Sequence, residues 1–123
     1  MRTSASLQGL RARKNARQRL LESELEKISR QLQEMGALKI VVFGSFAQGS
    51  IRSSSDLDLL VIMPPIMTGR QWMGKIYDEI DREVDSDILA FTDEELERIL
   101  PVSRFLRHAL ATGKVIYERR PER

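Results

Sequence analysis

Two short apolar runs on either side of a Gly/Ser-rich loop constrain the fold of this chain more than any other feature. The first run, KIVVF, stops at Gly44, and the second, DLDLLVIM, stops at Pro64. β-branched residues favour strands, glycine and serine favour turns, and proline cannot extend a strand ladder on both sides. The pattern predicts a strand, a turn that opens a short helix at residues 46–48, and a second strand.

Amphipathic segments surround these two strands. Apolar residues at 3–4 spacing indicate helices, and "TDEE" after the third strand is typical of a capping box between Thr92 and Glu95. The further predicted elements are a helix from Leu21 to Met35 ended by Gly36, a helix over about 70–83, a strand over 85–91, a helix from 93 that Pro101 interrupts, a helix over 103–112 and a short strand over 114–118. The first of these helices could serve a helix–helix contact, but packing on its own sheet is favoured. The chain of 123 residues is expected to form one α/β (α+β) domain.

Charge is distributed unevenly along the sequence. All six basic residues of the N-terminal segment precede Glu22, the first acidic residue, so the remainder carries a net negative charge. We predict a basic arm over 1–20, a domain over 21–118 and a tail over 119–123. A basic arm can contact a phosphate or a partner, although a solvated helix face or a frayed end is favoured here. Direct nucleic-acid binding is not expected, because the acidic body is not typical of such a surface.

Composition limits the kinds of site that the chain can form and indicates its cellular location. The chain has no cysteine, which excludes disulfides and thiolate zinc sites. No apolar run approaches the roughly 18 residues of a membrane span, and the basic N-terminal segment lacks the apolar region of a signal peptide. We expect a cytoplasmic protein.

Two carboxylates lie one residue apart at the head of the second strand. Asp56 and Asp58 are expected to project from the same face, because alternate strand residues do so. Carboxylates held side by side repel each other, and a hard divalent cation such as Mg²⁺ relieves the repulsion with oxygen ligands. The alternative is an exposed edge strand with two solvated aspartates.

The preceding loop favours a phosphate ligand. Gly44 and Gly49 permit backbone conformations that bring amides close to a ligand, and Ser45 adds a hydroxyl. The N-terminus of the short helix at 46–48 attracts anions. A phosphate-binding turn next to a metal-binding pair forms a coherent site.

The segment GSFAQGSIRSSSDLDLLV resembles the motif of the DNA polymerase β-type nucleotidyltransferase superfamily, a Gly-Ser turn followed about ten residues later by Asp-x-Asp. The short chain and its "SDLDLLV" ending are most similar to the minimal nucleotidyltransferases (MNT) of prokaryotes. The resemblance covers about residues 36–117. It implies a small mixed β-sheet flanked by helices and transfer of a nucleotide from ATP with two Mg²⁺ ions. Gln48 stands where the family commonly has a basic residue.

The resemblance also implies the site residues. Asp56 and Asp58 would bind both ions, and a third carboxylate would come from the next strand. Asp87 fits that place at the head of DILAF, whereas Asp85 is interpreted as a surface residue of the turn. The expected catalytic and metal-binding residues are Asp56, Asp58 and Asp87, and the expected nucleotide-binding residues are Gly44, Ser45 and Ser55.

Minimal nucleotidyltransferases of this kind are often encoded beside a HEPN-domain RNase toxin and act as its antitoxin. The resemblance therefore implies transfer of AMP to a tyrosine of such a partner, which would supply the acceptor that a chain this small has little room to bind. Two alternatives remain: an antitoxin that neutralises its partner by binding alone, and a transferase of a small hydroxylated molecule. Either a homodimer or a hetero-oligomer is compatible with the sequence.

Three other residues receive structural interpretations. His108, the only histidine, is interpreted as a surface residue of the last helix. Trp72 lies on an apolar stripe and is expected in the core. Lys75 is interpreted as a solvated lysine.

Overall fold

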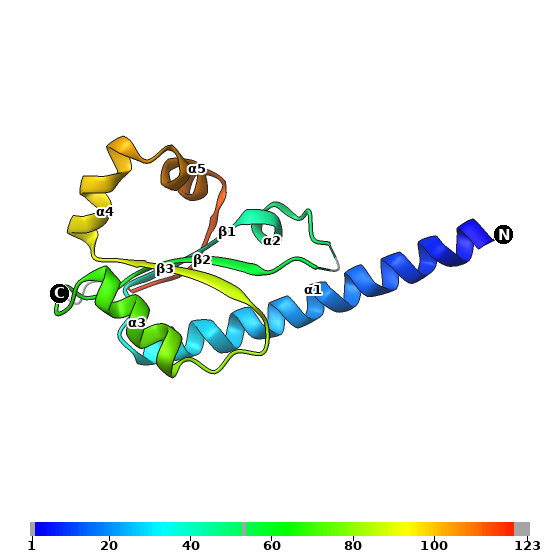
Figure 1. Cartoon of the computed structure of the whole chain (residues 1–123), viewed down its shortest axis with the longest axis horizontal. Coiled ribbons are helices and arrows are strands. Elements are labelled where there is room, and N and C mark those ends of the chain that lie inside the picture. The colour runs from blue at the N-terminus through cyan, green and yellow to red at the C-terminus, as the bar shows by residue number, and fades with distance from the viewer. Residues whose placement is uncertain (1, 53, 120–123) are drawn as a thin grey trace.

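The two apolar runs form neighbouring strands, as the sequence predicts. The computed structural model describes residues 2–52 and 54–119 of the protein, and it has helices on both faces of a four-stranded sheet (Figure 1). In chain order the elements are α1 (Arg2–Glu34), β1 (Lys39–Phe43), α2 (Gly44–Gln48), β2 (Leu57–Ile62), α3 (Gly69–Glu79), β3 (Ser86–Phe91), α4 (Asp93–Ile99), the 3₁₀ helix η1 (Leu100–Val102), α5 (Arg104–Thr112) and β4 (Lys114–Glu118).

The sheet is mixed, with the strand order β3-β2-β1-β4. β1 is antiparallel to both β2 and β4, whereas β2 and β3 run parallel. β2 therefore lies inside the sheet, and the alternative that Asp56 and Asp58 mark an exposed edge strand is wrong. The predicted α/β (α+β) class with a small mixed sheet flanked by helices is confirmed.

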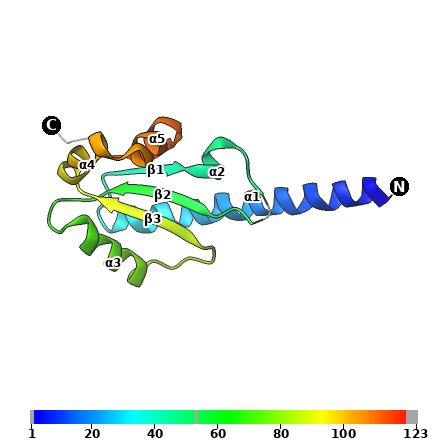
Figure 2. The same cartoon turned by 45° about the horizontal axis from the view of Figure 1, so that its top comes forward.

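Alternation of side chains along the strands creates two apolar layers. On one face, Leu57, Leu59 and Val61 of β2 pack in a cluster with residues of α1 and α3. On the other face, Leu60 and Ile62 pack with residues of α4 and α5. Figure 2 shows the sheet between these two pairs of helices. Trp72 is 2% exposed within the first cluster, which confirms its predicted place in the core.

Helix α1 starts much earlier than the predicted Leu21. It runs without interruption from Arg2 to Glu34, so the predicted boundary at residue 20 falls inside it. Leu21, Ile28 and Leu32 are fully buried against the sheet, which confirms packing on the chain's own sheet. The half of α1 before Leu21 extends away from the body (Figures 1 and 2).

Most of the predicted tail, residues 120–123, lies outside the described residues. Over the part that the structure describes, no helix combines the length and the apolar character needed to cross a membrane.

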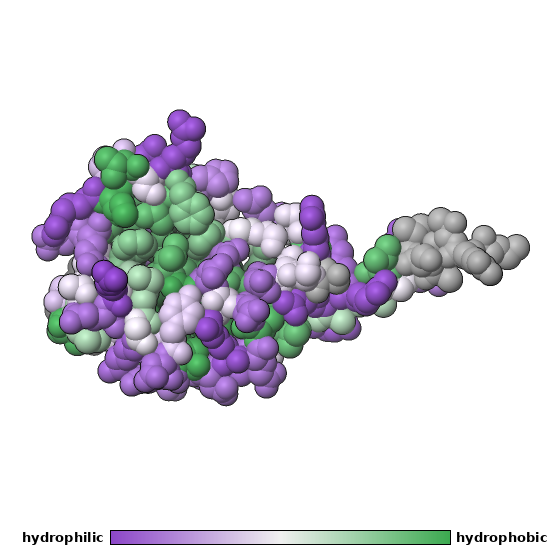
Figure 3. All heavy atoms as spheres, in the orientation of Figure 1, coloured by the Kyte–Doolittle hydropathy of each residue, from purple (hydrophilic) through white to green (hydrophobic). Residues whose placement is uncertain are grey.

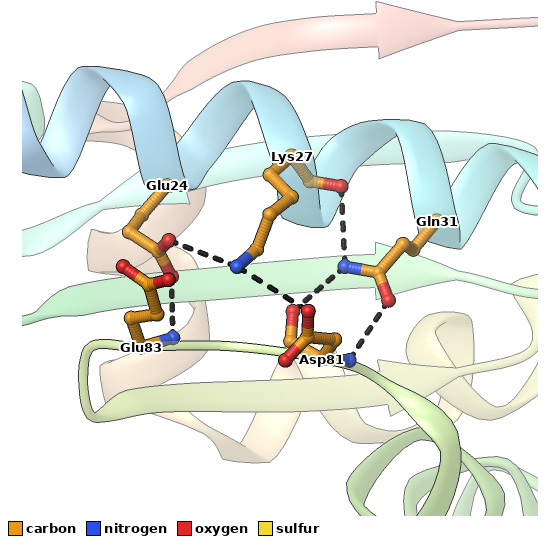
Figure 4. Close-up of polar contacts among 5 residues, drawn as sticks. All are labelled: Glu24, Lys27, Gln31, Asp81 and Glu83. Carbon is orange, nitrogen blue, oxygen red and sulfur yellow. Dashed lines mark hydrogen bonds and ion pairs between the residues drawn. The ribbon is translucent and has the colours of Figure 1, made fainter.

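Helix α3 ends at Glu79, about four residues before its predicted end, because α1 binds the chain that follows. Gln31 accepts a hydrogen bond from the Asp81 amide (2.8 Å) and donates one to the Asp81 carbonyl (2.8 Å). Glu24 accepts one from the Glu83 amide (2.8 Å). These contacts satisfy the backbone outside a helix and lead the chain into β3 (Figure 4).

Glu24 is the one buried acidic side chain among the residues that the structure describes. Its side chain is 5% exposed, and Lys27 Nζ lies 3.2 Å from its carboxylate. Burial alone would raise the pKa of Glu24, but the Glu83 amide and the Lys27 ammonium together hold that pKa below its usual value. Glu24 is therefore a charged anchor between α1 and the α3–β3 connection.

The capping box at the start of α4 is confirmed. The Thr92 hydroxyl accepts from the Glu95 amide, and the Glu95 carboxylate accepts from the Thr92 amide. The same carboxylate accepts from the Gly69 amide at the start of α3 (2.9 Å). One side chain thus joins the N-termini of two helices on opposite faces of the sheet.

Candidate active site

Gly44 forms the turn between β1 and α2. Its φ of 75° lies in the left-handed region, which favours glycine. A Cβ atom at this position would overlap the carboxylate of Asp58. Two features therefore require a glycine at position 44: its backbone conformation and the close approach of Asp58 to the turn.

Asp58 and Asp87 are neighbours across two parallel strands. The register pairs them directly, and it pairs Asp58 with Phe43 on the other side. Alternate residues that follow on β2 and β3, Leu60 and Leu89, pack in the α4–α5 layer. The two carboxylates thus lie at the end of the sheet face that α5 covers, next to the Gly44 turn.

The surroundings of Asp58 disfavour its charge. Burial raises the pKa of the Asp58 carboxyl, and the negative charges of Asp87 and Asp56 raise it further. This electrostatic crowding is the condition under which a bound cation stabilises a carboxylate cluster.

Asp56 directly precedes β2, and its carboxylate contacts helix α1. Nη2 of Arg17 lies 3.1 Å from Oδ1 of Asp56. The Arg17 Nε donates to the Ser55 carbonyl (2.7 Å). The sequence analysis missed Arg17, because 39 residues separate it from Asp56 and no spacing rule connects them.

A pocket of about 550 Å³ adjoins the two paired carboxylates. Asp58 and Asp87 line it together with Gly44, and Phe43 and Phe105 contribute apolar walls. The two phenyl rings meet edge to face, with centroids 5.8 Å apart. The remaining lining residues are Gln48, Met73, Tyr77, Ile88, Leu89, His108, Ala109 and Thr112.

A second pocket, of about 380 Å³, also borders Asp87. It is lined by Asp56, Tyr77, Arg82, Asp85, Ser86 and Asp87. The Tyr77 hydroxyl accepts from the Ile88 amide (2.7 Å), and the Arg82 guanidinium stacks over the Tyr77 ring (4.5 Å to the centroid). Arg82 also donates to the Ser86 carbonyl (2.7 Å). This cation near the carboxylates was likewise not predicted.

The structure gives less direct support to the two serines that were predicted to bind nucleotide. Neither Ser45 nor Ser55 lines these two pockets. The Ser55 hydroxyl accepts from the Arg52 amide (2.7 Å), so it holds the turn that precedes Asp56. Ser45 lies in the first turn of α2, half-buried.

The other interpreted residues lie on the surface. His108 is exposed, as predicted, and in addition it lines the larger pocket. Lys75 is exposed, with its Nζ 5.9 Å from the centre of the Trp72 ring. Asp85 is exposed and lies just before β3, in agreement with its interpretation as a turn residue.

Comparison with known proteins decides the family. The family described as "Polymerase beta, Nucleotidyltransferase" matches residues 25–122, which is most of the chain. The chain belongs to the polymerase beta nucleotidyltransferase family. Nucleotidyl transfer is the general activity of this family, and the protein is accordingly a transferase.

A solved structure agrees with this fold. A Sulfolobus solfataricus protein, described as a "putative nucleotidyltransferase", has a crystal structure that superposes with a TM-score of 0.53. The two chains are 17% identical, and the match covers 88% of this nucleotidyltransferase and 86% of the other. No curated protein sequence matches the chain.

Nucleotidyltransferases generally use a nucleoside triphosphate and a divalent metal. Within residues 2–52 and 54–119, no three His, Cys, Asp or Glu side chains are already grouped to hold a metal ion. The chemistry of the donors nevertheless fits a hard cation, because Asp58 is crowded by two further carboxylates that raise its pKa. Asp58 and Asp87 are adjacent, whereas Asp56 is paired with Arg17 through Oδ1.

Proposed function

We propose that this nucleotidyltransferase is a Mg²⁺-dependent enzyme that transfers AMP from ATP to a protein hydroxyl, specifically a tyrosine of a HEPN-domain partner toxin, and thereby acts as an antitoxin. One observation carries the transfer reaction: Asp58 and Asp87 are paired in register beside the Gly44 turn and line one pocket. The choice of ATP and of the partner rests on the resemblance to minimal nucleotidyltransferases.

The reaction assigns a role to each carboxylate. The acceptor oxygen forms a bond to the α-phosphorus of ATP while the bond to the β-phosphate oxygen breaks and pyrophosphate leaves. Asp87 accepts the proton of the attacking hydroxyl, because it borders both pockets and so lies where two substrates can meet. Asp56 and Asp58 would hold the divalent ions. When bound, Mg²⁺ would neutralise charge on the phosphoryl oxygens.

The pocket suits a nucleotide in size and polarity. Its volume of about 550 Å³ lies within the range of small-molecule sites. Acidic groups lie at one end, and the Phe43 and Phe105 rings provide an apolar wall for a base or ribose. The Gly44 turn lies at the same end, and Ser45 and Ser55 flank the two ends of the loop that follows it.

The rim of the pocket supports a protein acceptor. Phe105 lines the pocket yet is 58% exposed, and Val102 on the neighbouring η1 is 82% exposed. Ile99 at the end of α4 adds to this apolar surface. Figure 3 shows hydrophobic side chains gathered on the side of the molecule that carries α4 and α5. Exposed apolar patches of this kind mark interaction surfaces, among them those that bind protein partners.

The test uses ATP labelled at the α-phosphate, Mg²⁺ and the HEPN protein encoded nearest to this chain. We expect label on the HEPN protein, located by mass spectrometry on a tyrosine, and none after chelation or with Asp58→Asn. Asp78→Asn, which changes an exposed carboxylate of α3 that lines neither pocket, serves as the control and should retain labelling. A stable complex with no transferred label would show neutralisation by binding alone, and labelling of a small hydroxylated molecule in place of the protein would also refute the proposal.

A further inference from the structure

Arg17 differs from the other residues of the projecting segment of α1 whose side chains the structure describes. Of residues 8–20, it alone is not exposed, and its side chain retains 20% of its accessible surface. It makes two contacts with the loop before β2, through Nε to the Ser55 carbonyl and through Nη2 to the Asp56 carboxylate. A solvated helix face would hold neither contact, so this part of the arm has a specific place on the body.

Arg17 lies at the boundary between the part of α1 that packs on the sheet and the part that projects from the body. One turn later, Leu21 is fully buried, and from there α1 packs against the sheet. One turn earlier, Arg13 is exposed on the half that extends from the body (Figure 1). Arg17 can therefore release the loop without disturbing the core beneath it.

The contact matters because the residue that Arg17 binds is Asp56. Asp56 is one of three carboxylates whose charges meet around Asp58. The positive charge of the guanidinium offsets part of the negative charge of this group, and a divalent cation would have the same effect. A guanidinium bound to Oδ1 of Asp56 and a cation at the same oxygen exclude each other.

We propose that Arg17 is a tethered counter-ion that occupies Asp56 in the free protein and competes there with the divalent cation. The inference rests on the proposed function in one respect, the assignment of Asp56 as a metal ligand. It makes α1 part of the metal site, since a cation that binds Oδ1 of Asp56 displaces the Arg17 guanidinium and one at the other oxygen is repelled by its charge. Arg17 is thus a regulatory residue, distinct from the carboxylates that contact substrate.

The test compares Arg17→Gln with Arg19→Gln, which removes the same charge from an exposed position of the same helix. Binding of Mn²⁺ alone, without nucleotide, is measured by calorimetry and by electron paramagnetic resonance. We expect Arg17→Gln to bind Mn²⁺ about two- to fivefold more tightly than wild type, the range of a partly exposed ion pair. Arg19→Gln should match wild type at physiological salt, where screening limits charge effects to about 8 Å.

Arg17→Lys separates competition from positioning. Lysine keeps the charge but cannot bond Ser55 and Asp56 with one rigid fork. Competition predicts an affinity between wild type and Arg17→Gln. Weaker Mn²⁺ binding in both variants would show that Arg17 supports the site instead, and equal binding in Arg17→Gln and Arg19→Gln would show no competition; either result overturns the inference.

A second measurement needs no metal. Melting temperatures of Arg17→Gln, Asp56→Asn and the double variant, taken with a chelator, should be non-additive because the two side chains contact each other. Additive shifts would overturn the contact itself while leaving the transferase proposal intact. If wild type and Arg17→Gln both fail to bind Mn²⁺, the metal-dependent function and the competition fall together, whatever the melting data show.

Discussion

The Cα of Gly44 lies so close to the carboxylate of Asp58 that a side chain on residue 44 would collide with it. This contact joins the turn that follows β1 to the carboxylate on β2. It makes the position of Asp58 depend on a glycine 14 residues earlier, and it gives a sharp test of how tightly the site is packed.

Gly44→Ala should therefore lower both stability and transfer activity. Gly49→Ala is the matched control, since Gly49 has nearly the same φ (73°) but nothing within 4 Å of an added Cβ. The control should cost about 1–2 kcal/mol for the left-handed conformation alone. Gly44→Ala should cost a further 1–3 kcal/mol, roughly, for the collision. Equal unfolding free energies from urea titration would show that Asp58 moves aside freely.

Asp58→Asn should stabilise the metal-free protein at neutral pH. The raised pKa of Asp58 means that the folded chain holds its proton more tightly than the unfolded chain. Ionisation of Asp58 therefore weakens the fold as pH rises from the ordinary value of 3.8 through the raised pKa. The variant should melt higher than wild type at neutral pH in a chelator, and the two curves should converge as pH falls toward that ordinary value. A variant less stable at neutral pH would contradict this account.

Asp87→Asn should abolish most of the transfer activity while ATP binding persists. Loss of a proton acceptor lowers the rate about 100- to 10,000-fold. Asp85→Asn should stay within a few-fold of wild type, because Asp85 lies before β3, outside the register that pairs Asp87 with Asp58. Single-turnover rates and nucleotide affinities are measured for both variants. An inactive Asp85 variant beside an active Asp87 variant would reverse the assignment.

Glu24→Ala should destabilise the fold by about 1–3 kcal/mol, because it removes a charged acceptor from the Glu83 amide. Glu26→Ala is the control; Glu26 is exposed and pairs with Arg30 within the helix at 3.5 Å, so its loss should cost about 0.5 kcal/mol or less. Since the pKa of Glu24 is lowered, its contribution is present above the ordinary value of 4.5 and disappears as pH falls through the lowered pKa. Urea titrations at both ends of this range check the prediction.

Local sequence patterns predicted most of the elements. The run KIVVF became β1, the Gly44 turn opened α2, and the Thr92–Glu95 box began α4 where expected. These features depend on residues one to four positions apart, whose geometry the backbone itself fixes. The same reasoning placed Asp87 inside β3 and Asp85 before it.

Contacts between distant segments needed the tertiary structure. The end of α3 at Glu79 depends on Gln31 and Glu24, which lie about 50 positions earlier and outweigh the helical pattern beyond it. The pairing of Asp58 with Asp87 depends on the parallel register of β2 and β3, which apolar alternation does not determine because every two-residue shift keeps the same faces.

The sequence by itself therefore identified the candidate site residues: the Gly-Ser turn, Asp56 and Asp58 at the start of β2, and Asp87 in β3. Only the tertiary structure decided what surrounds them. Arg17 meets Asp56 because α1 packs across the sheet and brings residues 39 positions apart into contact. Spacing along the chain does not predict such a contact, because the contact arises from the packing of two elements that are far apart in the sequence.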